Sequence, residues 1–81
     1  MKREDVYKLI DGERNYQDKL STRPDIPIEE ELIILRTYLR KTEDTYTATF
    51  DDPKELPTMA FIRKLAGICV RCMENHETSA R

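Results

Sequence analysis

Two cysteines and the only histidine of the chain lie close together near its C-terminal end. In the segment CVRCMENHE, Cys69, Cys72 and His76 follow one another at intervals of three and four residues. Thiolate and imidazole groups are preferred zinc ligands, but a structural zinc site usually needs four such groups and this chain has three. A fourth ligand would have to be a carboxylate or come from another chain. The sequence therefore disfavours a zinc site, and we predict neither a metal nor a cofactor.

The same cysteines could instead form a redox pair. Thioredoxin-like pairs lie at the N-terminus of a helix that follows a strand, because the helix dipole there favours the thiolate. Cys69 and Cys72 lie near the C-terminal end of an expected helix, and with His76 they occupy positions i, i+3 and i+7 of one helical stripe. Ile62 and Leu65 belong to the same stripe two turns earlier. We therefore interpret the two cysteines as small apolar members of a buried helical seam.

Three consecutive glutamates, residues 29–31, form the second group that could carry chemistry. Helical nucleotide hydrolases place glutamates at i, i+1 and i+4 of one helix, and an acid pair on another, so that the carboxylates converge on Mg²⁺. Here Ile33, Ile34 and Leu35 follow the triplet, so a second acidic turn is missing. Carboxylates in a first helical turn also complement the helix dipole, and this is the better explanation. With no Gly-rich phosphate loop and no supported nucleophile, we predict no catalytic residue and no enzyme activity.

Several basic residues could form a cationic face for an anionic ligand or an acidic partner. They are Arg36, Arg40, Lys41, Arg63, Lys64 and Arg71. An ordinary solvated helix surface explains the same residues and is favoured. The net charge is −2, from 14 basic and 16 acidic residues, so we expect no nucleic-acid partner.

Hydrophobic periodicity predicts one all-α domain over residues 1–81, a small three-helix bundle. The helices are expected at about 3–20, 27–45 and 57–76, followed by a frayed tail at 77–81. Gly12 in the first helix marks a close helix contact, a kink or a tolerated surface glycine. The second helix is expected to end near Thr45, with Tyr46 or Phe50 packing against the core from the following loop.

The apolar positions of the second helix recur at intervals of four, three and four residues. They are Ile28, Leu32, Leu35 and Leu39, and Ile34 and Tyr38 widen the stripe on one flank. This pattern predicts the face that the second helix turns toward the core.

The third helix is apolar around about two-thirds of its circumference. Two partner helices do not obviously cover all of this apolar arc. We therefore expect part of this arc to contact a second copy of the chain or another protein. The candidate oligomer or partner interface is Phe61, Ile62, Leu65, Ile68, Cys69, Cys72 and Met73.

The sequence has no apolar stretch near the ~20 residues that span a bilayer, and its N-terminus lacks the apolar core of a signal peptide. Two cysteines are too few for a typical disulfide scaffold. We therefore expect reduced thiols, a cytoplasmic location and no insertion into the membrane.

Two stretches, YKLIDGERNYQDK (residues 7–19) and IRKLAGICVRCMENH (residues 62–76), resemble the ends of small phage-encoded helical proteins. Those segments are in turn similar to MazG-like all-α nucleotide pyrophosphohydrolases. That family carries E-E-x-x-E and E-x-x-D motifs, whereas this chain has LRTYLRKTED and MAFIRKLAG in the corresponding places. The resemblance implies a bundle that has lost its Mg²⁺ ligands. The alternative hypothesis is that this chain binds a nucleotide, either as the remnant of a pyrophosphohydrolase or as a protein that sequesters nucleotides.

In size and character the chain is also similar to the antiholin-type lysis-inhibition proteins of T4-like phages. This resemblance implies a non-enzymatic regulator in the host cytoplasm that binds the cytoplasmic part of a holin, or else a host factor. It supplies no binding residues.

Overall fold

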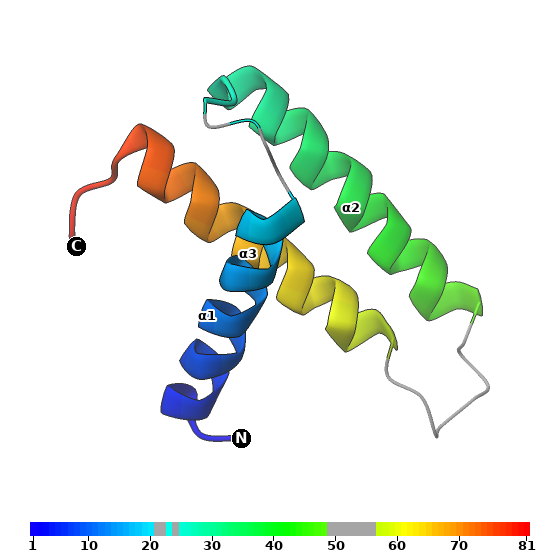
Figure 1. Ribbon diagram of the computed structural model, residues 1–81. Helices are drawn as coiled ribbons and strands as arrows, with labels where there is room; N and C mark the ends of the chain where they lie inside the picture. Colours follow the sequence, from blue (N-terminus) through cyan, green and yellow to red (C-terminus); the bar gives the residue numbers. More distant parts are fainter. Residues whose placement is uncertain (21–22, 24, 49–56) are drawn as a thin grey trace.

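The computed structural model describes residues 1–20, 23, 25–48 and 57–81. These residues form three helices, α1 (Arg3–Leu20), α2 (Ile28–Ala48) and α3 (Pro57–His76), as Figure 1 shows. The predicted all-α, three-helix fold is confirmed. None of the helices in these ranges is long and apolar enough to cross a membrane.

Local signals set the ends of the helices. Glu4 and Asp5 stand in the first turn of α1, and Pro57 is the first residue of α3, where its missing N–H is not needed. The Glu31 amide donates to the Pro27 carbonyl at 3.0 Å and closes the first turn of α2. Glu77 adopts a φ of 55°, the left-handed conformation that ends many helices, and the exposed residues 77–81 follow it outside any helix.

Helix α2 continues three residues beyond its predicted end at Thr45. The Thr42 hydroxyl donates to the Tyr38 carbonyl at 2.7 Å, and the Thr47 hydroxyl donates to the Glu43 carbonyl at 3.0 Å. Because these hydroxyls bond inside the helix, the β-branched residues do not end it. Of the two side chains predicted as alternatives to pack against the core, Tyr46 does not do so, since it is 55% exposed on the helix surface. Phe50 lies outside the described residues.

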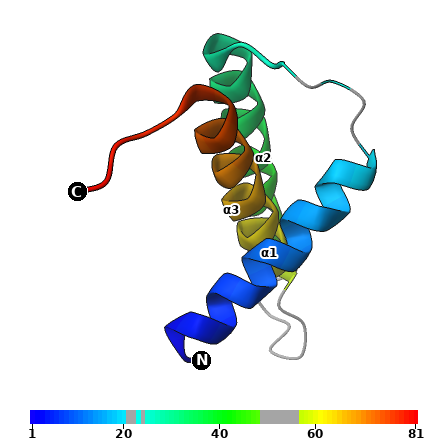
Figure 2. The same ribbon diagram turned by 60° about the vertical axis from the view of Figure 1, so that its left-hand side comes forward.

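Helix α3 is the centre of the fold. Helix α2 runs antiparallel along it, whereas α1 crosses it obliquely (Figure 2). Both outer helices contact α3, and within the described ranges α1 and α2 do not contact each other. The third side of α3 is therefore left open.

The interfaces between the helices are unusually polar. Among the described residues, the buried apolar side chains are Ile26 and Ile68, and the buried polar ones are Glu13, Gln17, Glu31 and Thr42. Gly67 allows the closest approach of α1 to α3, because a Cβ there would lie 2.8 Å from Gln17 Nε2. At Gly12 a Cβ would meet nothing within 4 Å, so Gly12 makes no close helix contact and is a tolerated glycine of a surface helix.

The predicted core face of α2 is wrong at three positions. Ile28, Leu32 and Leu39 are 40%, 58% and 50% exposed, whereas Leu35 is half-buried. The side that faces α3 carries Ile34 and Tyr38, which were predicted on the flank of the stripe, together with Glu31 and Thr42. The physical reason is the ion pair between Glu31 and Arg71, which requires this side of α2 to turn inward.

Candidate functional site

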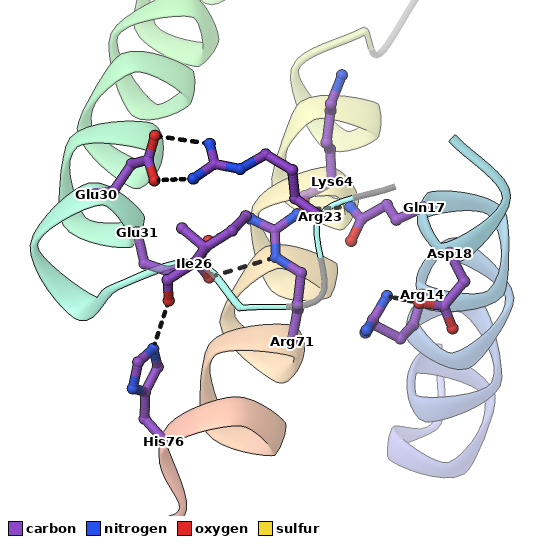
Figure 3. A network of polar contacts seen from close by, with 10 residues as sticks. All are labelled: Arg14, Gln17, Asp18, Arg23, Ile26, Glu30, Glu31, Lys64, Arg71 and His76. Atoms are coloured by element: carbon purple, nitrogen blue, oxygen red, sulfur yellow. Dashed lines mark hydrogen bonds and ion pairs between the residues drawn. The ribbon is translucent and has the colours of Figure 1, made fainter. Parts of the chain in front are cut away.

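A buried ion pair joins α2 to α3 (Figure 3). Glu31 is completely buried, and its Oε1 accepts from Arg71 Nη2 at 2.6 Å. Close by, His76 Nε2 donates to the Ile26 carbonyl at 2.9 Å. These contacts tie both ends of the segment 26–31 to the C-terminal half of α3. The cluster is structural, since each polar group in it already has a partner inside the chain.

Polar side chains also attach α1 to α3. Glu13 pairs with Arg63 at 3.0 Å, and Gln17 Nε2 donates to the Lys64 carbonyl at 3.1 Å. Arg14 bridges Asp18 of its own helix at 2.6 Å and Glu74 of α3 at 2.8 Å.

The three glutamates of residues 29–31 do not converge on one point. Glu30 pairs with Arg23 at 2.7 Å, and the hydrogen bond from Arg23 lowers the pKa of the Glu30 carboxyl. Glu31 is held by Arg71 at the α2–α3 interface, and Glu29 is exposed. In the described part of the chain, no group of three His, Cys, Asp or Glu side chains is arranged to hold a metal ion.

The two cysteines occupy different environments. Both are free thiols, but Cys69 is exposed and Cys72 is half-buried. The interpretation of a buried seam therefore fails for Cys69, because α1 and α2 cover two sides of α3 and leave Cys69 on the third. His76 uses its Nε2 on the Ile26 carbonyl rather than facing the sulfur atoms as part of a ligand set.

Alkylation should separate the two thiols. Burial raises the pKa of the Cys72 thiol, and the nearby Glu31 carboxylate raises it further. Because the thiolate is the nucleophile, we expect iodoacetamide at neutral pH to modify Cys69 first and Cys72 slowly. Mass spectrometry of Cys69→Ser and Cys72→Ser measures this directly. Only Cys72→Ser should retain the fast phase; equal rates in the two variants would contradict the assignment.

The predicted cationic face is not a single surface. Arg63 and Arg71 are each paired with a glutamate, Glu13 and Glu31 respectively. Lys41 and Lys64 come together on the ring of Tyr38, with their Nζ atoms 5.0 and 4.4 Å from its centroid. Arg36 and Arg40 are exposed on α2. Four of the six residues therefore contact different local partners, which their sequence spacing does not reveal.

The predicted apolar interface on α3 is divided in the same way. Ile68 is only 3% exposed and belongs to the core, so it is not accessible to a partner. Phe61, Leu65 and Cys72 are half-buried. Ile62, Cys69 and Met73 are exposed, and Met59, which was not predicted, is exposed on the same side of the helix.

An apolar groove lies between α1 and α3, on the open side of α3. Its apolar lining is Tyr7, Ile10, Ala66, Cys69, Val70 and Met73. Asp11, Arg14 and Glu74 complete the lining with charged side chains. We call this site the α1–α3 groove. Cys69 and Met73 were predicted from the sequence as interface residues, but the lining residues of α1 were not, because the crossing of two helices is not encoded in the periodicity of either.

In comparisons with protein-family models, with curated proteins and with solved structures, nothing matched this chain.

Proposed function

We propose that this protein is a non-enzymatic regulator that binds another protein through the α1–α3 groove. The observation that carries the proposal is the apolar character of the groove together with its openness to solvent. Tyr7 is 62% exposed and Met73 is 48% exposed, in a chain with few buried apolar side chains. Covering such side chains releases free energy, at roughly 25 cal/mol for each Å² of apolar surface.

The shape and chemistry of the groove suit an amphipathic helix. Helix-binding grooves combine an apolar lining with charged residues at the rim, and here Asp11, Arg14 and Glu74 supply the charges. Met73 has an unbranched, flexible side chain, which adapts to the shape of a ligand. A partner segment with one apolar face and mixed charges on its flanks would fit both features.

The specific form of the proposal is a cytoplasmic lysis-inhibition protein that binds the cytoplasmic segment of a phage holin. The two stretches that resemble small phage-encoded helical proteins, residues 7–19 and 62–76, belong to α1 and α3 and contain all of the groove lining. The resemblance to antiholin-type proteins rests on size and character and supplies no residues, so the support for the proposal is the apolar, open groove itself. A host protein with a similar amphipathic segment is the other partner to test.

Binding is measured by isothermal titration of the full chain with a synthetic holin segment. We expect a complex at micromolar concentration, and Met73→Asp should weaken it by roughly tenfold or more because it places a charge in the apolar lining. Ile33→Asp is the matched control, since Ile33 is 64% exposed on α2 and does not line the groove. Absence of a complex would contradict the holin assignment, and equal affinities of wild type and Met73→Asp would contradict the groove.

A further inference from the structure

We infer that the protein is a homodimer in which two α2 helices pair through an apolar stripe of that helix. The stripe consists of Ile28, Leu32 and Leu39, which are exposed, and Leu35, which is half-buried, and we call it the α2 stripe. It is separate from the α1–α3 groove, so the inference adds a second interaction surface to the one proposed above.

The α2 stripe is not the side by which α2 packs in its own chain. At about 100° per residue, the four side chains lie within roughly 60° of one another around the helix axis. Glu31, Tyr38 and Thr42, which face inward, lie roughly 50–90° from the centre of the stripe, and half-buried Leu35 lies between them and the exposed members of the stripe. Helix α2 therefore has two adjacent faces suited to burial, one against α3 and an apolar one that is mostly exposed.

The chain exposes more surface than a compact monomer of its mass. Its accessible area is 6791 Å². A monomer of 9.6 kDa is expected to expose about 5,100 Å², which is about 1,700 Å² less. A standard interface removes about 800 Å² from each partner. The excess over the whole chain is therefore larger than the area that each partner of a standard interface buries.

The radius of gyration leads to the same conclusion. The radius of gyration of the Cα atoms is 13.9 Å, whereas a compact chain of 81 residues is expected to have about 11.7 Å. The excess area thus reflects an open arrangement of the helices.

The spacing of the stripe is compatible with an identical helix as its partner. Intervals of four, three and four residues are those of alternating d and a positions in a heptad, by which equal helices can pair. A two-fold pair uses the same patch on both chains, so every contact occurs twice. In an antiparallel pair Leu32 packs against the partner's Leu35, and Leu39 packs against the partner's Ile28.

The charges beside the stripe select this antiparallel arrangement. Glu29 and Arg36 are exposed on the edge of the stripe away from α3, one heptad apart. Like edges meet in an antiparallel pair, so Arg36 lies beside the partner's Glu29 and the contact is made twice. In a parallel pair the carboxylate nearest Arg36 would be that of residue 31, but Glu31 is fully buried and held by Arg71.

Sedimentation equilibrium of the full chain tests the inference. Wild type should have about twice the 9.6 kDa mass of one chain at micromolar concentration. Leu32→Arg should be monomeric, with dimerisation weakened more than roughly a hundredfold, because it places a charge in the apolar seam. Ile33→Arg, on the opposite side of α2, is the matched control and should remain dimeric. Circular dichroism checks that each variant keeps its helix content.

A charge exchange tests the antiparallel register. Arg36→Glu should weaken the dimer by roughly tenfold, because it brings like charges together twice. Adding Glu29→Arg to the same chain should restore it. If the double variant does not regain the dimer affinity of wild type, the antiparallel register is overturned. If wild type has the mass of a single chain, the dimer itself is overturned.

Failure of this inference is distinguishable from failure of the proposed function. Met73→Asp should remain dimeric, and Leu32→Arg should still bind the holin segment. A monomeric wild type that binds the segment overturns the dimer alone. A dimeric wild type that does not bind it supports the dimer and contradicts the proposed partner.

Discussion

Glu31→Ala is expected to lower the free energy of unfolding by about 3–5 kcal/mol, the usual cost of removing one partner of a buried ion pair. The Glu31 side chain is completely buried, and the Arg71 side chain that it holds is only 13% exposed. Without the carboxylate, the guanidinium stays in a desolvated position with no counter-charge. Urea denaturation followed by circular dichroism measures the effect.

Two controls separate the loss of the ion pair from a general effect of mutating this helix. Asp44→Ala removes an exposed carboxylate from the same helix, on the side away from the α2 stripe, and we expect a change within about 0.5 kcal/mol. The double variant Glu31→Leu with Arg71→Met removes both charges and should recover most of the stability, because an apolar pair carries no desolvation penalty. Equal stabilities of Glu31→Ala and Asp44→Ala would show that the ion pair contributes nothing.

Ile68→Ala is the second substitution with a large expected effect, a loss of about 2–5 kcal/mol. Ile68 is 3% exposed at the centre of α3, and Ile26 is the other buried apolar side chain among the described residues. A core this small has few apolar atoms that could rearrange to fill the cavity, which is why we expect most of the effect to persist.

The matched control for Ile68→Ala is Ile33→Ala. It makes the same chemical change at a side chain that is 64% exposed, and stability should change by no more than about 0.5 kcal/mol. Thermal denaturation of both variants compares them directly. A similar loss of stability in both variants would mean that the effect of Ile68→Ala comes from helix propensity rather than from core packing.

The sequence predicted the extents of α1 and α3 well, because their limits depend on local chemistry. Acidic residues favour the start of α1, and a proline marks the start of α3. The end of α2 was predicted too early, because a run of threonine and aromatic residues suggests extended backbone whereas threonine hydroxyls can also bond inside a helix. Local rules thus identify helices more reliably than they identify the ends of helices.

The orientation of α2 could not be read from its apolar pattern. The pattern correctly identified Leu32 and Leu39 as one stripe, but an apolar stripe indicates only that burial is favourable and does not specify what covers it. The sequence does not show that Glu31 and Arg71, 40 residues apart, form the contact that turns this stripe away from α3. Similarly, the candidate basic and apolar residues of α3 do not form single surfaces, because α1 packs against some of them and α2 packs against others.

The polar attachment of α1 has a further consequence for the stability of the groove. Helix α1 is joined to α3 by ion pairs such as Glu13–Arg63 and Arg14–Glu74, in which Arg63 and Glu74 are each 49% exposed. The other partners, Glu13 and Arg14, are only 7% and 13% exposed, so dissolved salt screens these pairs less than fully exposed pairs but more than the buried Glu31–Arg71 pair. Rising ionic strength should therefore weaken the docking of α1 on α3 more than the docking of α2. Because α1 forms one wall of the groove, a ligand that binds in the groove stabilises the docked state of α1. The affinity for this ligand therefore depends on the salt concentration, even if the ligand carries no charge.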